Sequence, residues 1–70
     1  MKVLNRNQVY RTIRVECDAE AVEQLREWGT VSQIGEDLNT YELTVYDDVS
    51  FPSICKLLLM WQDESERLNS

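Results

Sequence analysis

Apolar and polar residues alternate along the chain from Gln8 to Cys17. Because side chains point to opposite faces of a strand in turn, this period of two predicts a half-buried strand, with Arg11 the one misfit on its inner face. The inner face is otherwise apolar and consists of Val9, Ile13, Val15 and Cys17. The outer face consists of Tyr10, Thr12, Arg14 and Glu16.

A helical pattern follows over residues 19–28. Asp18 is a favourable N-cap, and Glu20 and Glu23 suit the positive end of the helix dipole. An apolar stripe recurs at helical spacing: Ala21, Val22, Leu25 and Trp28. Gly29 then predicts the end of this helix, since glycine commonly follows a helix C-terminus.

Two further strands and a turn are predicted next. Residues 31–35 form a less regular strand, because Gln33 and Gly35 interrupt its alternation, and residues 36–39 have the composition of a hairpin turn. The strand at 40–46 alternates clearly. Tyr41, Leu43 and Val45 lie on one side, and Glu42, Thr44 and Tyr46 lie on the other.

The last predicted element is a helix that begins near Ser50. The Ser50 side chain can cap it, and Pro52 is tolerated because the first-turn N–H groups have no helical partner. Its apolar face is expected to hold Ile54, Leu57, Leu58, Trp61 and Leu68.

The element order β-α-β-β-α predicts an α+β fold. A right-handed crossover places the third strand between the first two, which gives a three-stranded antiparallel sheet of order 1-3-2 with two helices packed on one face. This order resembles a truncated ferredoxin-like or ACT-like fold that lacks the closing fourth strand. The resemblance is confined to element order and implies no function. Without a fourth strand, the strand at 8–17 would keep an open edge.

Length and charge narrow the class of protein. Seventy residues predict a single domain, 1–70, whose core is small enough that self-association becomes attractive. The net charge is −6: the first fourteen positions hold four basic residues and no acid, and the remainder holds three basic and thirteen acidic residues. Binding to nucleic acid is therefore disfavoured. With no long apolar run and no signal-peptide pattern, we expect no membrane association and a cytoplasmic location.

Little in the chain suggests catalysis. Histidine is absent, and Cys17 and Cys55 are too far apart in sequence for a Cys-x-x-Cys site. We therefore expect no enzyme activity, no metal and no cofactor. The two cysteines are expected to be buried free thiols at opposite ends of the sheet. The pairs Asp47–Asp48 and Asp63–Glu64 are interpreted as capping or solvated residues.

Three surfaces remain as candidate interaction sites. Residues 57–61 are all apolar, and one helix face can bury only some of these side chains. Leu59 and Met60 are therefore expected to form a contact surface, unless the chain termini cover them. The outer sheet face is the second candidate, with Tyr10, Thr12, Arg14, Glu42, Thr44 and Tyr46. The third is an acidic stripe on the first helix, formed by Glu20, Glu23 and Glu27, which is either solvated or a mimic of nucleic-acid phosphates.

These observations favour a small regulatory or adaptor module that binds another protein, self-associates as a homodimer or larger homo-oligomer, or does both. One alternative is an acidic inhibitor that mimics nucleic acid, as small phage inhibitors do. Another is a small-molecule sensor of the ACT type with its ligand at a dimer seam.

Overall fold

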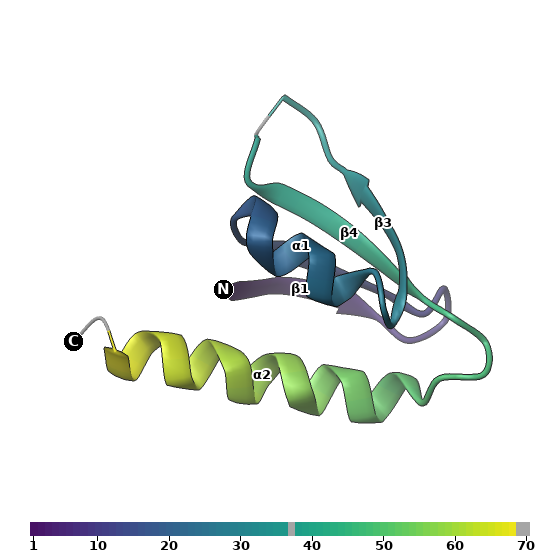
Figure 1. Ribbon diagram of the computed structural model, residues 1–70. Helices are drawn as coiled ribbons and strands as arrows, with labels where there is room; N and C mark the ends of the chain where they lie inside the picture. Colours follow the sequence, from purple (N-terminus) through teal and green to yellow (C-terminus); the bar gives the residue numbers. More distant parts are fainter. Residues whose placement is uncertain (37, 69–70) are drawn as a thin grey trace.

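The computed structural model describes residues 1–36 and 38–68, the side chain of Leu68 excepted. Its elements follow the order β-β-α-β-β-α (Figure 1). They are β1 (Lys2–Asn7), β2 (Thr12–Glu16), α1 (Ala19–Leu25), β3 (Gly29–Gln33), β4 (Thr40–Val45) and α2 (Phe51–Leu68). Asp37 of the predicted turn lies outside the described residues, as does the Leu68 side chain that was expected on the apolar face of α2.

The sheet is antiparallel and has the strand order β1-β2-β4-β3, with α1 and α2 against one face. The α+β class and the two helices are confirmed, and β2, β4 and β3 keep the predicted relative order. The prediction of three strands is wrong. The fourth strand is β1, which pairs with β2 along the edge that was expected to be open. It shows no alternating pattern because only Val3 of the strand is half-buried.

The strand predicted at 8–17 corresponds to β2, which begins four residues later than predicted because residues 8–11 form the turn between β1 and β2. The Asn7 side-chain oxygen accepts hydrogen bonds from the backbone N–H groups of Val9 (3.0 Å) and Tyr10 (3.3 Å), which is the usual way an asparagine stabilises a turn. Val9 is therefore exposed and not part of the inner face.

Arg11 closes this turn and holds a second connection in place. It has a positive φ of 56°. Its backbone oxygen accepts from the N–H of Val45 at 2.9 Å, and its guanidinium Nη2 donates to the carbonyl oxygens of Tyr46 (2.7 Å) and Val49. Arg11, the one residue that did not fit the predicted inner face, thus joins the β1–β2 turn to the β4–α2 connection.

Helix α1 begins as predicted but ends earlier. The Asp18 carboxylate accepts from the Ala21 N–H at 3.0 Å, as an N-cap does. The helix ends at Leu25, and residues 26–28 form a turn. Gly29 is the first residue of β3, and its φ is not positive. A Cβ there would lie 2.1 Å from the backbone oxygen of Thr44, so glycine is required by close packing on β4.

The core lies between the sheet and the two helices. Its fully buried side chains come from β2, α1, β4 and α2, and both cysteines are buried and free. The largest are Ile13, Val15, Leu25, Leu43 and Leu58. Trp28 and Trp61 pack against them while partly exposed. Leu57, expected on the apolar face, is instead 45% exposed on the flank of α2.

Replacing Leu58 by alanine tests this assignment of faces. Leu58 is 0% exposed, and a buried leucine truncated to alanine typically costs about 2–5 kcal/mol. A domain of this size has little more stability than that. We expect Leu58→Ala to lower the melting temperature drastically and Leu57→Ala to leave it nearly unchanged, as followed by circular dichroism. Equal melting of the two variants would contradict the assigned faces.

Replacing Gly29 by alanine tests the close approach of β3 to β4. The added methyl group collides with backbone atoms that no side-chain rotation can move, so we expect a cost of about 3 kcal/mol or more in urea unfolding. Gly35→Ala is the control. Gly35 has a positive φ of 64° but open space around it, so only about 1 kcal/mol of backbone strain is expected. A smaller cost at Gly29 than at Gly35 would contradict the packing argument.

Candidate functional site

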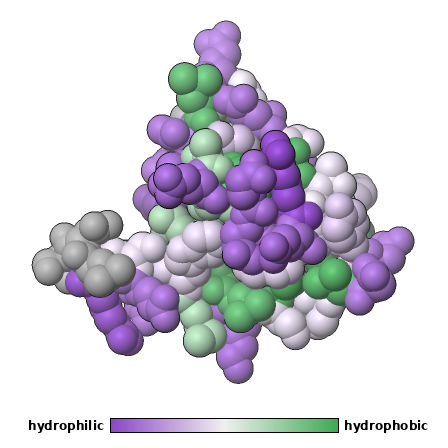
Figure 2. Space-filling view, in the orientation of Figure 1, coloured by the Kyte–Doolittle hydropathy of each residue, from purple (hydrophilic) through white to green (hydrophobic). Residues whose placement is uncertain are grey.

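Leu59 and Met60 lie on solvent-exposed surface of α2, 45% and 53% exposed. Leu58 marks the centre of the buried side of the helix, and each residue adds about 100° around the axis. Leu59 therefore lies on one flank and Met60 on the back. Figure 2 shows hydrophobic surface gathered over α2 along the lower part of the molecule.

The Leu59 flank faces β1. Leu59 and Cys55 of α2, with Val3 and Leu4 of β1, line a hollow of about 300 Å³ that reaches down to Ile13. Leu4 sits at the irregularity in the β1–β2 pairing and is 44% exposed. It adds a third large apolar residue beside Leu59. The alternation of the sequence does not predict it, because that alternation begins only at Gln8; the apolar pair Val3–Leu4 is the one sequence signal for this edge strand.

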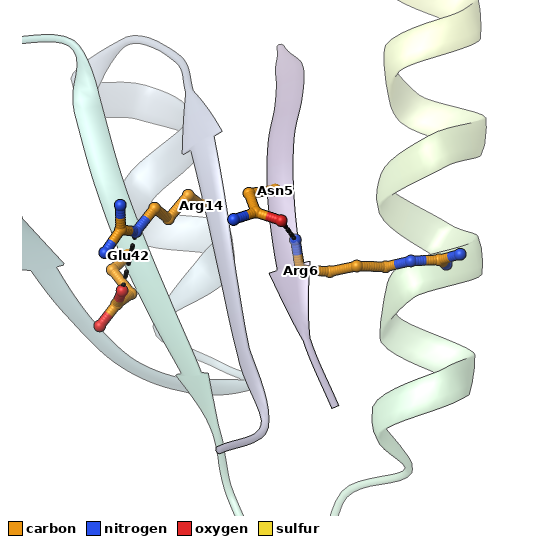
Figure 3. Close-up of polar contacts among 4 residues, drawn as sticks. All are labelled: Asn5, Arg6, Arg14 and Glu42. Carbon is orange, nitrogen blue, oxygen red and sulfur yellow. Dashed lines mark hydrogen bonds and ion pairs between the residues drawn. The ribbon is translucent and has the colours of Figure 1, made fainter. Parts of the chain in front are cut away.

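Charged residues border this apolar surface. A second hollow, of about 420 Å³, is lined on the α2 side by Lys56, Leu59, Met60 and Asp63, and Arg6 of β1 also lines it. Figure 3 shows the Arg6 side chain extending from β1 toward α2, away from the polar face of the sheet. Within the described part of the chain, neither Arg6 nor Lys56 takes part in an ion pair. We call Leu4, Lys56, Leu59, Met60 and Asp63 the α2 patch.

The free edge of β1 is capped by side chains. The Val3 N–H donates to the Gln62 side-chain oxygen of α2 at 2.7 Å, and the Arg6 N–H donates to the Asn5 side-chain oxygen at 2.8 Å (Figure 3). Two backbone donors of β1 are thus already bonded to side chains and are not free to pair with another strand. The open edge predicted for the strand at 8–17 is covered by β1, and two donors on the outer edge of β1 are in turn bonded to side chains.

The outer sheet face is polar, and its charges pair with each other. Thr12 lies opposite Thr44, and Arg14 lies opposite Glu42. The Arg14 Nε is 3.1 Å from a Glu42 carboxylate oxygen (Figure 3). Because Arg14 and Glu42 pair with each other and Thr12 and Thr44 add no apolar cluster, burying this face against a partner would contribute little binding free energy.

The two tyrosines of this candidate site lie apart from the strand positions expected for them. Tyr10 belongs to the β1–β2 turn, and it joins Thr12, Arg14 and Glu42 in lining a shallow hollow of about 340 Å³. Tyr46 lies just beyond the end of β4 and is 46% exposed. The structure thus brings Tyr10, Thr12, Arg14 and Glu42 together, with Thr44 adjacent through its pairing to Thr12.

The acidic stripe is not continuous. Glu20 and Glu23 lie on α1, but Glu27 lies in the turn beyond it, so the stripe expected on a helix over 19–28 is interrupted. The Glu23 carboxylate is 3.3 Å from the Arg26 guanidinium, and Glu27 accepts a hydrogen bond from the side chain of Gln24 at 2.9 Å. Two of the three carboxylates are therefore already engaged within the chain.

A hollow between α1 and α2, unsuspected from sequence, is about 600 Å³ in volume and includes Cys17, Asp18, Glu20 and Glu64 in its lining. Burial, with the nearby negative charge of Asp18, raises the pKa of the Cys17 thiol. The thiol is therefore protonated at neutral pH and is not activated as a nucleophile. Over residues 1–36 and 38–68, no three histidine, cysteine, aspartate or glutamate side chains are grouped so as to hold a metal ion.

Neither helix, over its described residues, is long and apolar enough to cross a membrane. Comparison with known proteins finds no matching family model, no matching curated protein and no matching solved structure. The α2 patch, built from two elements and bordered by charge, is therefore identified as the candidate site on its geometry alone.

Proposed function

We propose that this chain is a small, non-enzymatic protein-interaction module of a regulatory or adaptor kind that self-associates through the α2 patch. The observation that carries the proposal is the grouping of Leu4, Leu59 and Met60, all about half exposed. Leu4 and Leu59 line the seam between β1 and α2, and Met60 lies beside Leu59 on the back of the helix. Burying apolar surface contributes about 25 cal/mol per Å², so such a grouping is a source of association free energy.

The sheet is a weaker candidate for the interaction surface, because its polar groups are already paired within the chain. Its edge at β1 is capped by Gln62 and Asn5, and its outer face pairs Arg14 with Glu42. The other edge strand, β3, has only five residues, of which Gly29 is buried and Val31 half-buried. We therefore place the contact on the helix and not on the sheet.

The chemistry of the described side chains also favours binding over catalysis. The chain contains no histidine to act as a general base. The pKa of the Cys17 thiol is raised by burial, whereas nucleophilic cysteines need a lowered one.

For the topology, we propose a ferredoxin-like arrangement whose closing edge strand comes from the N-terminus of the chain instead of the C-terminus. The order β1-β2-β4-β3 supports this, since β1 takes the place beside β2 that the truncated arrangement left empty. The proposal concerns architecture and carries no function with it.

Two glutamate substitutions, one in α2 and one beyond β4, test the interaction surface. Met60→Glu places a charge in the α2 patch and is expected to dissociate the dimer. Tyr46→Glu is the matched control, because Tyr46 is similarly exposed, at 46%, but lies beyond β4. Sedimentation equilibrium should give twice the chain mass of 8.2 kDa for the native chain and for Tyr46→Glu, and the monomer mass for Met60→Glu.

Dissociation by Tyr46→Glu with a persistent dimer in Met60→Glu would move the interface to the sheet side. A native chain that stays monomeric at high micromolar concentration would reject self-association. Far-UV circular dichroism of both variants shows whether the fold is intact, so that unfolding is not mistaken for dissociation.

A further inference from the structure

The exposed row of α2 is complementary to itself when its direction is reversed. Lys56, Leu59, Met60 and Asp63 are separated by three, one and three positions, and residues three or four apart lie on neighbouring parts of a helix surface. The row thus begins with a cation, continues with two large apolar side chains and ends with an anion. Reversing its direction exchanges the signs of the two ends and leaves the apolar centre in place.

We propose that the occupant of the α2 patch is α2 of a second copy, antiparallel and related by a two-fold axis that passes between Leu59 and Met60. This rests on the proposed function and specifies its partner and geometry. In this register Leu59 faces Met60 of the second copy, and Lys56 faces Asp63 of the second copy. The two-fold repeats both contacts, so one patch meets an identical patch, as a closed dimer requires.

Charge on both sides of the row selects this direction. Arg6 also lines a hollow with Phe51 and Pro52 at the start of α2, so a second basic residue lies at the Lys56 end of the row. Beyond Asp63 the helix holds Glu66 on the Leu59 side and Arg67 as its one basic residue, so the end of the row carries more acid than base. Glu64 lies outside the row, beside Trp61. An antiparallel pair of helices places the basic half of each against the acidic half of the other. A parallel pair would set Lys56 against Lys56 and Asp63 against Asp63, which like-charge repulsion disfavours.

Both charges of the row remain accessible for such a contact. The Asp63 carboxylate is 3.4 Å from the Arg67 guanidinium in the same helix, but its side chain is 65% exposed. Lys56 is exposed and forms no ion pair among the residues that the structure describes. Burial of Leu59 and Met60, with Leu4 at the rim, supplies the association, while the two Lys56–Asp63 pairs fix register and direction.

The test is a charge exchange between two variants of the full chain. Lys56→Glu alone sets a carboxylate against Asp63 of the second copy, and Asp63→Lys alone sets two ammonium groups together. Each variant is expected to self-associate at least about tenfold more weakly than the native chain, because like charges then face each other twice in the dimer. In an equimolar mixture, the heterodimer pairs unlike charges at both contacts: the new glutamate at position 56 faces the new lysine at position 63, and the native Asp63 faces the native Lys56. A heterodimer should therefore form with close to native affinity. Sedimentation and native mass spectrometry, with one variant labelled with ¹⁵N, measure this.

Glu64→Lys is the matched control, because it replaces an acidic residue by lysine as Asp63→Lys does, but one residue further, on the side of α2 that lies beside Trp61. It should dimerise like the native chain. If the native chain dimerises but the charge variants dimerise equally well, the proposed register is wrong while self-association stands. If both variants weaken the dimer and mixing does not restore it, the antiparallel pairing is overturned. If the native chain is monomeric, this inference and the self-association both fail.

Discussion

The close approach of Gly29 to β4 is the constraint on which the rest of the sheet depends. With no Cβ at this position, β3 can lie directly against the backbone of Thr44 and Val45. The Tyr46 N–H then bonds to the Trp28 carbonyl oxygen at 3.1 Å, at the junction where the chain leaves α1. Leu25 is thereby held over the inner face of the sheet and fully buried. The absence of a side chain at Gly29 thus permits the close pairing of β3 with β4, next to the hydrogen bond that joins the turn after α1 to Tyr46.

The polar and apolar faces of the sheet follow from that placement and decide where contacts are left over. Strands β2 and β4 direct their apolar residues to the helices and their polar residues outward, where Arg14 and Glu42 satisfy each other. Helix α2 has more apolar surface than this small core can cover. Its excess lies on the flanks and back, at Leu57, Leu59 and Met60, and Leu4 of β1 adds to it on the Leu59 side.

Sequence alone predicts the parts of the fold in which burial imposes a period. The alternation in β2 and β4 indicated the inner faces correctly, and the five-residue apolar run at 57–61 indicated that Leu59 and Met60 would be left over. Prediction from the sequence pattern fails for elements whose burial requires no periodic arrangement of apolar residues. Strand β1 is an edge strand with one half-buried residue, so it carries no alternation, and with it Leu4 and Arg6 were missed. Gly29 resembles a helix terminator in sequence, and only its contact with Thr44 reveals its packing role.

Helix α2 has two roles: one of its side chains caps the edge strand β1, and others form the exposed contact surface. Gln62 caps the Val3 N–H from the same helix that carries Leu59, Met60 and Asp63, and Val3 and Gln62 are 59 positions apart in the chain. Docking α2 on β1 therefore occupies one backbone donor of an edge that could pair with any strand, without selectivity. In its place the molecule presents side chains whose apolar and charged groups have a defined order. A contact made through such side chains can discriminate among partners, because like charges facing each other cost binding free energy whereas a backbone edge accepts nearly any sequence.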